Sequence, residues 1–252
     1  MGHNTTRLKL LRGRHSYCSL YGHFLLRHYL ILSKAGDGSH DSTRIDHLDP
    51  EAFSAHPHYR RGHWPLIHSV SFYSEANIIA SARTASGVFI ISRKTGAVLW
   101  HLAAPIVCQQ HRAHQINAAG DILIPNNGVF RPEISVPFSQ AIIVSLDKQI
   151  RWEYKDTTTG GLGLFTPFMG SAQKLGGENV LIREAATGCI IEVTQGGEVV
   201  WEFVVPQLQD YRAVMSKDEF EKMERVGFSN ESNAIFRAYK YRPDDVLWVK
   251  EG

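Results

Sequence analysis

The chain has few cysteines, no long uninterrupted apolar run and almost no net charge. Its three cysteines, Cys18, Cys108 and Cys189, are an odd number without short spacings, which excludes a zinc ribbon and argues against a disulfide framework. A signal-peptide core needs about 7–15 consecutive apolar residues, and a membrane helix about 18 or more. Near the N-terminus, Arg27 and His28 interrupt the apolar residues. As written, the sequence therefore predicts no signal peptide, no membrane span and a cytoplasmic protein.

The charge balance gives no sign of a highly charged partner, because the formal net charge is only +2. A basic surplus exists locally, since residues 1–34 hold six Arg or Lys and no acidic residue. That segment contains no recognisable nucleic-acid-binding module. We therefore predict no nucleic-acid partner.

The composition changes near residue 45. Residues 1–45 are rich in Arg, His, Leu and Tyr, end in a polar stretch at 36–43, and show no clean helical or strand period. The remaining residues show regular apolar patterning, and a hydrophobic fraction of 43% is sufficient for a core. We predict a loosely ordered extension over residues 1–45 and one domain over residues 46–252.

Residues 46–252 contain a repeat of four short apolar strands joined by glycine-bearing turns. Each repeat closes on a tryptophan, Trp100, Trp152 or Trp201, and these are 52 and 49 residues apart. Four strands at a period of about 50 residues are typical of β-propeller blades, where such a tryptophan packs between neighbouring blades. The expected strands are residues 69–72, 77–81, 87–92 and 97–100, then 114–116, 121–124, 141–145 and 149–152, then 171–175, 179–182, 189–193 and 198–201.

The predicted fold class is therefore all-β, a β-propeller of four-stranded blades. Three full repeats with partial ones at both ends give about four or five blades, and closed rings have about 4–8, so a truncated six-bladed ring also fits. A capping-box pattern at residues 216–219 predicts a short helix over 219–225, outside the blades. The apolar and aromatic residues 233–241 predict one more strand.

Four groups of segments, in this order, resemble the arylsulfate sulfotransferase family. They are residues 81–83 with 88–100, residues 110–111 with 120–128 and Arg131, residues 170–182 with 192–202, and residues 236–241. The resemblance covers about residues 46–248 and implies a propeller enzyme that moves a sulfuryl group from an aryl sulfate to a phenolic acceptor through a sulfohistidine. It implies no cofactor, metal or nucleotide donor, and family members are commonly exported.

The resemblance also implies site residues. His111, in a Gln-His motif, matches an active-site histidine of the family, and Arg131 matches its sulfate-binding arginine. Imidazole suits the attack on sulfur because it is largely neutral and nucleophilic near pH 7, and the guanidinium fork matches two sulfate oxygens. The full set of candidates comprises His111, His68 and His114 for catalysis and Arg131, Asn127 and Arg83 for substrate binding, with His111 and Arg131 expected where the blades open onto the central channel.

Two departures from the family pattern keep a second function open. All 13 histidines lie at or before His114, whereas the family's nucleophilic histidine comes from a later blade, where residues 165–171 offer no imidazole. The segment 64–70 is also shifted, with Leu66 where the family has histidine and His68 where it has asparagine. The alternative function is a non-catalytic propeller that binds a small anionic aromatic ligand or a protein partner.

Other histidine clusters carry weaker signals. The pair His111-x-x-His114 lacks the glutamate and the helical context of a zincin motif, so we predict no metal there. His56, His58 and His63 lie in a Pro- and Arg-containing stretch without acidic or thiolate neighbours, which predicts a solvated loop. The sequence leaves the substrate and the oligomeric state open.

Overall fold

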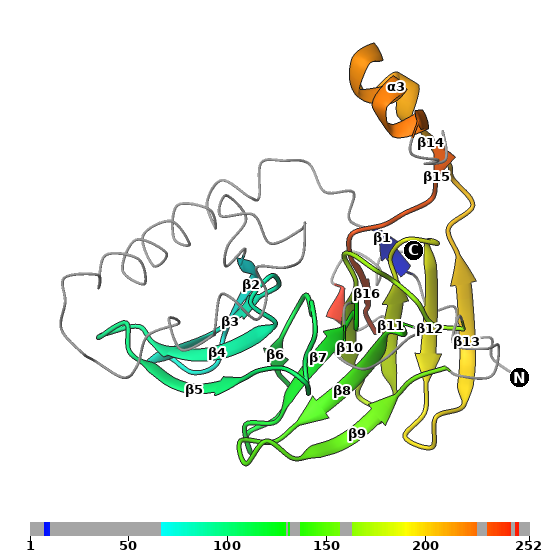
Figure 1. Ribbon diagram of the computed structural model, residues 1–252. Helices are drawn as coiled ribbons and strands as arrows, with labels where there is room; N and C mark the ends of the chain where they lie inside the picture. The colour runs from blue at the N-terminus through cyan, green and yellow to red at the C-terminus, as the bar shows by residue number, and fades with distance from the viewer. Residues whose placement is uncertain are drawn as a thin grey trace, which may run out of the picture. The chain divides into compact units, whose positions relative to one another are not determined.

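The computed structural model describes residues 8–10, 67–129, 131, 137–156, 163–225, 231–242 and 245–246. Its regular structure is mainly three four-stranded antiparallel sheets, in each of which the strands follow one another in sequence order (Figure 1). Short strands joined by tight turns favour this meander, because each tight turn returns the chain beside the strand that it has just left. The predicted all-β propeller class, with four-stranded blades, is confirmed.

The three blades begin and end close to the predicted limits. The first comprises β2 (Ile67–Phe72), β3 (Asn77–Ala82), β4 (Gly87–Ser92) and β5 (Val98–Leu102). The second comprises β6 (His114–Gln115), β7 (Ile122–Asn126), β8 (Gln140–Val144) and β9 (Ile150–Tyr154). The third comprises β10 (Ser171–Lys174), β11 (Val180–Glu184), β12 (Cys189–Val193) and β13 (Val199–Val204).

The blades repeat residue by residue, which the strand register makes visible. In each blade, one residue of every strand forms a row that ends at the closing tryptophan, here called the tryptophan row. The rows are Ser71–Ile79–Ile90–Trp100, His114–Leu123–Ile143–Trp152 and Gln173–Leu181–Glu192–Trp201. In all three blades the register shifts directly after the third member of the row. The tryptophan thus sits beside the same β-bulge in every blade.

The chain divides into two compact units, which are described separately. The unit Gly13–Pro167 holds the first and second blades. The other, Met1–Arg12 with Phe168–Gly252, holds the third blade and the smaller elements. The predicted boundary between residues 45 and 46 lies outside the described residues and stays a prediction, as does the loop around His56, His58 and His63.

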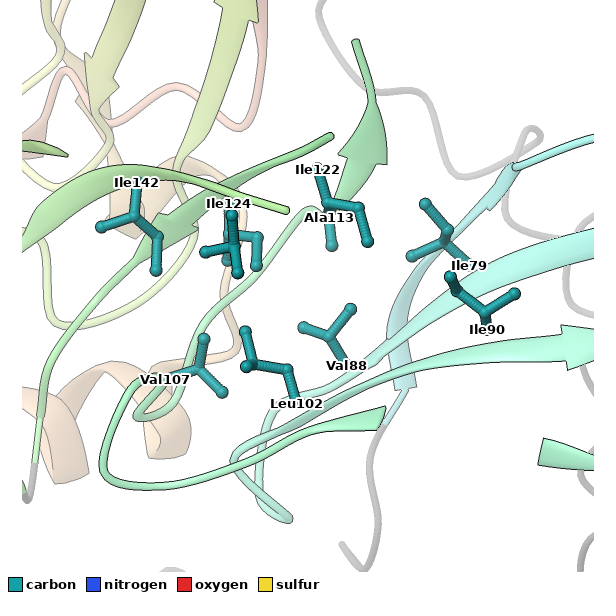
Figure 2. Close-up of a cluster of buried hydrophobic side chains, with 10 residues drawn as sticks. Ile79, Val88, Ile90, Leu102, Val107, Ala113, Ile122, Ile124 and Ile142 are labelled. Carbon is teal, nitrogen blue, oxygen red and sulfur yellow. The ribbon is translucent and has the colours of Figure 1, made fainter. Parts of the chain in front are cut away.

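The core of the unit Gly13–Pro167 lies between its two blades. Both faces of the central strands are apolar, so alternate residues of β3 bury toward different clusters: Ile79 belongs to the inter-blade cluster and Ile78 to the cluster on the other face. The inter-blade cluster, drawn in Figure 2, comprises Ile79, Val88, Ile90, Leu102, Val107, Ala113, Ile122, Ile124, Ile142 and Val144. Trp100 packs against this cluster, and its indole Nε1 donates a 2.8 Å hydrogen bond to Leu146 O in the second blade. This tryptophan joins neighbouring blades, as predicted.

The unit that contains the third blade carries shorter elements as well. They are β1 (Leu8–Leu10) paired with β16 (Ala238–Lys240), β14 (Gln209–Asp210) paired with β15 (Glu231–Ser232), the 3-10 helix η3 (Tyr211–Ala213) and the helix α3 (Lys217–Arg225). The predicted capping box is present, because the Ser216 backbone N–H donates to Glu219 Oε2 at 3.1 Å and the Glu219 N–H to Ser216 Oγ at 3.4 Å. Among the described residues, no helix has the length and apolar character needed to cross a bilayer.

Candidate functional site

Two histidines from consecutive blades meet at equivalent positions. His68 and His111 each lie three residues before the first member of the tryptophan row in their blade, a place that we call the first site position. Their ring centroids are 4.5 Å apart and the rings are inclined at 45°. The innermost strands β2 and β6 lie side by side, and Ser71 Oγ on β2 donates to Ala113 O at 2.9 Å. The packing of neighbouring blades therefore creates the histidine pair.

The His111 ring is held in one orientation by a relay of hydrogen bonds. Its Nδ1 lies 2.7 Å from Asn127 Oδ1, and Asn127 Nδ2 donates a 2.6 Å bond to Thr166 O. Because the amide nitrogen of Asn127 serves as this donor, its oxygen must act as the acceptor, so His111 Nδ1 carries the proton. The lone pair of a neutral ring then lies on Nε2. His111 is only 4% exposed, so this arrangement is buried.

His68 is kept neutral by its surroundings. Its Nε2 is buried, and no described residue offers it a hydrogen-bond partner. Burial, followed by the positive charge of Arg83, lowers the pKa of His68 to about 4. Near pH 7 the His68 imidazole is therefore uncharged, so its contact with His111 does not bring two cations together.

Arg83 and Asn127 are also equivalent to each other. Each lies four residues after the second-strand member of its tryptophan row, Ile79 or Leu123, and we call this place the second site position. Arg83 Nη2 donates to Pro167 O at 3.3 Å. Pro167 directly follows Thr166, whose carbonyl oxygen accepts the bond from Asn127 Nδ2. The segment at Thr166 and Pro167 thus anchors the second site position of both blades.

Arg131 presents hydrogen-bond donors beside the corner formed by Asn126, Asn127 and Gly128. Its guanidinium lies over the Phe138 ring, 4.5 Å from the centroid, and its Nε and Nη2 are buried without an acceptor among the described residues. Burial lowers the pKa of Arg131, while Cys108 and Glu153 act in the opposite direction. The side chain is still a cation near pH 7, because guanidinium pKa values lie far above that pH.

The Asn-Asn-Gly corner requires its glycine. Gly128 has a φ of +69°, and a Cβ built there would lie 2.0 Å from Phe138 O and 2.7 Å from Arg131 Nε. No other residue combines that backbone conformation with so close an approach. Gly128 therefore allows the Arg131 side chain to approach the backbone at Gly128 closely.

The remaining candidate, His114, occupies a strand position. It begins β6 and pairs with Leu123 as the first member of the tryptophan row. The structure thus gives His114 a place in the repeat, and its predicted catalytic role stays a prediction. The structure brings His68 and His111 into contact and joins Asn127 to His111 by a hydrogen bond, while the charge of Arg83 acts on His68.

Sequence reasoning missed the residues that hold this arrangement in place. Gln110 is fully buried, and its Nε2 lies within 3.1 Å of Ser81 Oγ and Ala82 O and 2.8 Å from Gly87 O, which pins the segment before His111 to the first blade. Ser139 Oγ donates to Asn127 O at 2.8 Å and accepts the Thr166 N–H at 2.9 Å. Only Gln110 had a signal, as part of the Gln-His motif.

The third blade departs from this pattern at both site positions. Three residues before the first member of its tryptophan row stands Gly170, and four residues after the second-strand member stands Ala185. Neither residue has a side chain that can donate, accept or attack. Among the described residues, no group of three or more His, Cys, Asp and Glu side chains is placed to hold a metal ion.

Similarity to solved structures extends over little more than half of this chain. A protein of unknown function from Bacteroides caccae is 21% identical, over 55% of this chain and 45% of its own, with a TM-score of 0.42. Virginiamycin B lyase from Staphylococcus aureus is 17% identical, over 57% of this chain and 42% of its own, with a TM-score of 0.39. The WD40 β-propeller domain of Doa1 is 7% identical, over 56% and 41%, with a TM-score of 0.40. The chain therefore spans less than half the length of each of these structures.

A sequence-family comparison is more direct. No curated protein matches the chain. The model of the arylsulfotransferase (ASST) family matches residues 51–205, which is more than half of the chain and includes both histidines, Arg83, Asn127 and Arg131. The chain belongs to the arylsulfotransferase family.

Proposed function

We propose that this protein transfers a sulfuryl group from an aryl sulfate to a phenolic acceptor, with His111 as the nucleophile. The observation that carries the proposal is the contact between His68 and His111, in which the Asn127–Thr166 relay directs the lone pair of His111 to Nε2. A neutral imidazole nitrogen is a competent nucleophile near pH 7 and can form a covalent intermediate.

In the first half of the reaction, His111 Nε2 attacks sulfur. The new N–S bond forms as the S–O bond to the aryl group breaks, and the bonding pair leaves with the oxygen as a phenolate. The ring becomes a positively charged sulfoimidazolium. Its Nδ1–H already faces Asn127 Oδ1 at 2.7 Å, so the developing charge meets an oriented amide dipole.

In the second half, the oxygen of a second phenol attacks the sulfur of sulfo-His111. The N–S bond breaks, its electrons return to Nε2, and the acceptor's proton passes to solvent or to the phenolate released earlier. His111 is then neutral again. The reaction consumes only the aryl sulfate and the phenolic acceptor, and each step conserves charge.

The cations and His68 support the transferred group and the leaving oxygen. Arg131 has two buried N–H groups, on Nε and Nη2, for which the described residues provide no acceptor, and a guanidinium binds two sulfuryl oxygens side by side. Arg83 lies close enough to His68 to lower its pKa, so its charge also acts where the phenolate develops. Neutral His68 can donate an N–H to the leaving oxygen without charge repulsion from His111.

Intact-mass spectrometry after incubation with an aryl sulfate tests the proposal. We expect a stoichiometric gain of one sulfuryl group that disappears in His111→Ala and that a phenol discharges. His101→Ala is the matched control, because His101 is an exposed histidine on β5 of the same unit. A folded protein that gains no adduct and releases no phenol from a chromogenic aryl sulfate would refute the proposal.

The third blade favours one alternative, a propeller that binds the aryl sulfate without reacting. Its first site position is Gly170, so the blade from which the resemblance leads us to expect a nucleophile has no imidazole there. On this alternative, Arg131 and the histidine pair would bind the anion, and no adduct would form. Binding of the aryl sulfate by a protein that forms no adduct would establish it.

A further inference from the structure

The third blade contains a buried arginine for which the described residues provide no counterion. Arg183, on β11, is 2% exposed, and its Nη1 and Nη2 have no hydrogen-bond acceptor among the described residues. Its Nε donates only a long 3.3 Å bond to Ser171 Oγ on the adjacent strand. A buried guanidinium is stable only when it is paired with an anion and its N–H groups are satisfied.

A second arginine is brought to the same place by the chain that returns over the blade. The Ile235 N–H donates to Ala185 O at 3.2 Å, and the Lys240 N–H donates to Gln173 Oε1 at 2.9 Å. Arg237 lies between these two anchors and is only partly buried. Burial and then the charge of Arg237 lower the pKa of Arg183 to about 9, so the charge of Arg237 acts on Arg183.

The first blade has a neutral side chain at the position that Arg183 occupies in the third blade. Ser81 lies two residues after the second-strand member of the tryptophan row, as Arg183 does in the third blade. Gln110, from the segment that leads to the next blade, satisfies Ser81 with an amide donor. In the third blade the carboxylate of Glu192 on β12 is paired with Lys240, whose Nζ forms an ion pair with Glu192 Oε2. The first blade's neutral contact is replaced by two cations.

We propose that Arg183 and Arg237 form a binding site for a dianionic oxyanion, such as inorganic sulfate or phosphate. Two guanidinium groups match the charge of a dianion, and their N–H forks match its oxygens. The anion would bind the Nη atoms of Arg183. It would enter from solvent past Arg237, which is only partly buried. This site lies in a different unit from the histidine pair and does not depend on the proposed transfer reaction.

Thermal unfolding with increasing sodium sulfate, at ionic strength kept constant with sodium chloride, tests the site. We expect wild-type protein to gain melting temperature in a saturable way, because a ligand that binds only the folded state stabilises it. In Arg183→Met the midpoint concentration should rise about tenfold or more. In chloride alone, Arg183→Met should melt above wild type, because a buried unpaired charge has been removed. Phosphate, titrated in parallel, should act like sulfate.

Three further variants make the test decisive. Arg237→Met, a change at a partly exposed residue, should weaken sulfate binding even if Arg183→Met fails to fold. Arg212→Met is the control, because Arg212 is exposed and pairs with Asp210. Sulfate binding that Arg131→Met abolishes and the Arg183 and Arg237 variants retain would place the anion at the histidine site and overturn the proposal. A wild-type protein without saturable stabilisation by sulfate or phosphate would overturn it as well.

Discussion

The first two blades and the third blade share a scaffold and differ at the first and second site positions. All three have the same four-residue row ending in tryptophan and the same register shift beside it. At the first site position they hold His68, His111 and Gly170. At the second site position Arg83 and Asn127 are followed by an alanine, so the third blade has neither an imidazole nor a polar partner for one.

The difference shows that the repeat is maintained by packing and the site is not. Row members such as Ile79, Leu123 and Leu181 are at most 2% exposed, and replacing any of them would open a cavity. The site positions lie at strand ends, where the core does not dictate the side chain. The candidate site side chains can therefore be present in two blades and absent from the third, while all three keep the tryptophan row and the register shift beside it.

The largest expected effect comes from breaking the second blade's site. His111→Ala should lower kcat for sulfuryl transfer by about 10³-fold or more, because losing a nucleophile removes the covalent route. Its thermal stability should change far less. Release of a chromogenic phenol measures the rate, with His101→Ala as the control on β5. A His111→Ala enzyme with wild-type kcat would assign the nucleophile to another residue.

Much of the scaffold could be predicted from the sequence because its signals are local. Alternating apolar residues and glycine turns define each strand, so residues 87–92 were predicted with the limits that β4 has in the structure, Gly87–Ser92. The periodic tryptophans indicated the blade and, for Trp100, the contact with the next blade. These features depend on neighbours within a few residues or on a counted repeat.

The contacts that build the two sites could not be predicted in this way. The ring contact between His68 and His111 arises from the packing of two blades, and the Thr166 carbonyl that orients Asn127 comes from a distant turn. The burial of Arg183 could not be predicted, because the predicted strand ends at residue 182, whereas β11 continues to Glu184. A lone arginine after an apolar strand resembles a surface residue until the covering segment is known.

The next effect tests the relay that orients His111. Asn127→Leu removes the acceptor for His111 Nδ1–H and should lower kcat by about 10–100-fold, a typical loss when the partner that fixes a histidine ring is removed. KM should change less, because the arginines remain. Asn127→Asp keeps an acceptor oxygen but raises the pKa of His111 through its negative charge, so its pH–rate profile should move to higher pH. Asn117→Ala, in an exposed turn of the same blade, is the control; an unchanged kcat in Asn127→Leu would exclude the relay.

The histidine pair should also make folding stability depend on pH. The folded-state pKa of His68 is about 4, below the ordinary 6.5, so between these values the unfolded chain binds more protons than the folded one. Stability must therefore fall as pH falls through this window, by about 1.5 kcal/mol between pH 6.5 and 5. Urea unfolding at both pH values measures the loss. His68→Gln should flatten the dependence by that amount, and an unchanged slope would contradict the buried neutral state.

A small effect is expected at the first site position of the third blade, where Gly170 stands in place of a histidine. Gly170 has a φ of +110°, a backbone conformation that side chains with a Cβ rarely adopt. Gly170→Ala should therefore destabilise the fold by about 1–2 kcal/mol. Gly177→Ala is the matched control, because Gly177 lies in a turn of the same blade with nothing within 4 Å of an added Cβ. If both variants unfold at the wild-type urea concentration, the backbone would accept a side chain, and the missing imidazole would be a difference of sequence alone. If only Gly170→Ala is destabilised, the third blade differs from the other two in its main chain, and a single substitution cannot make the three blades equivalent.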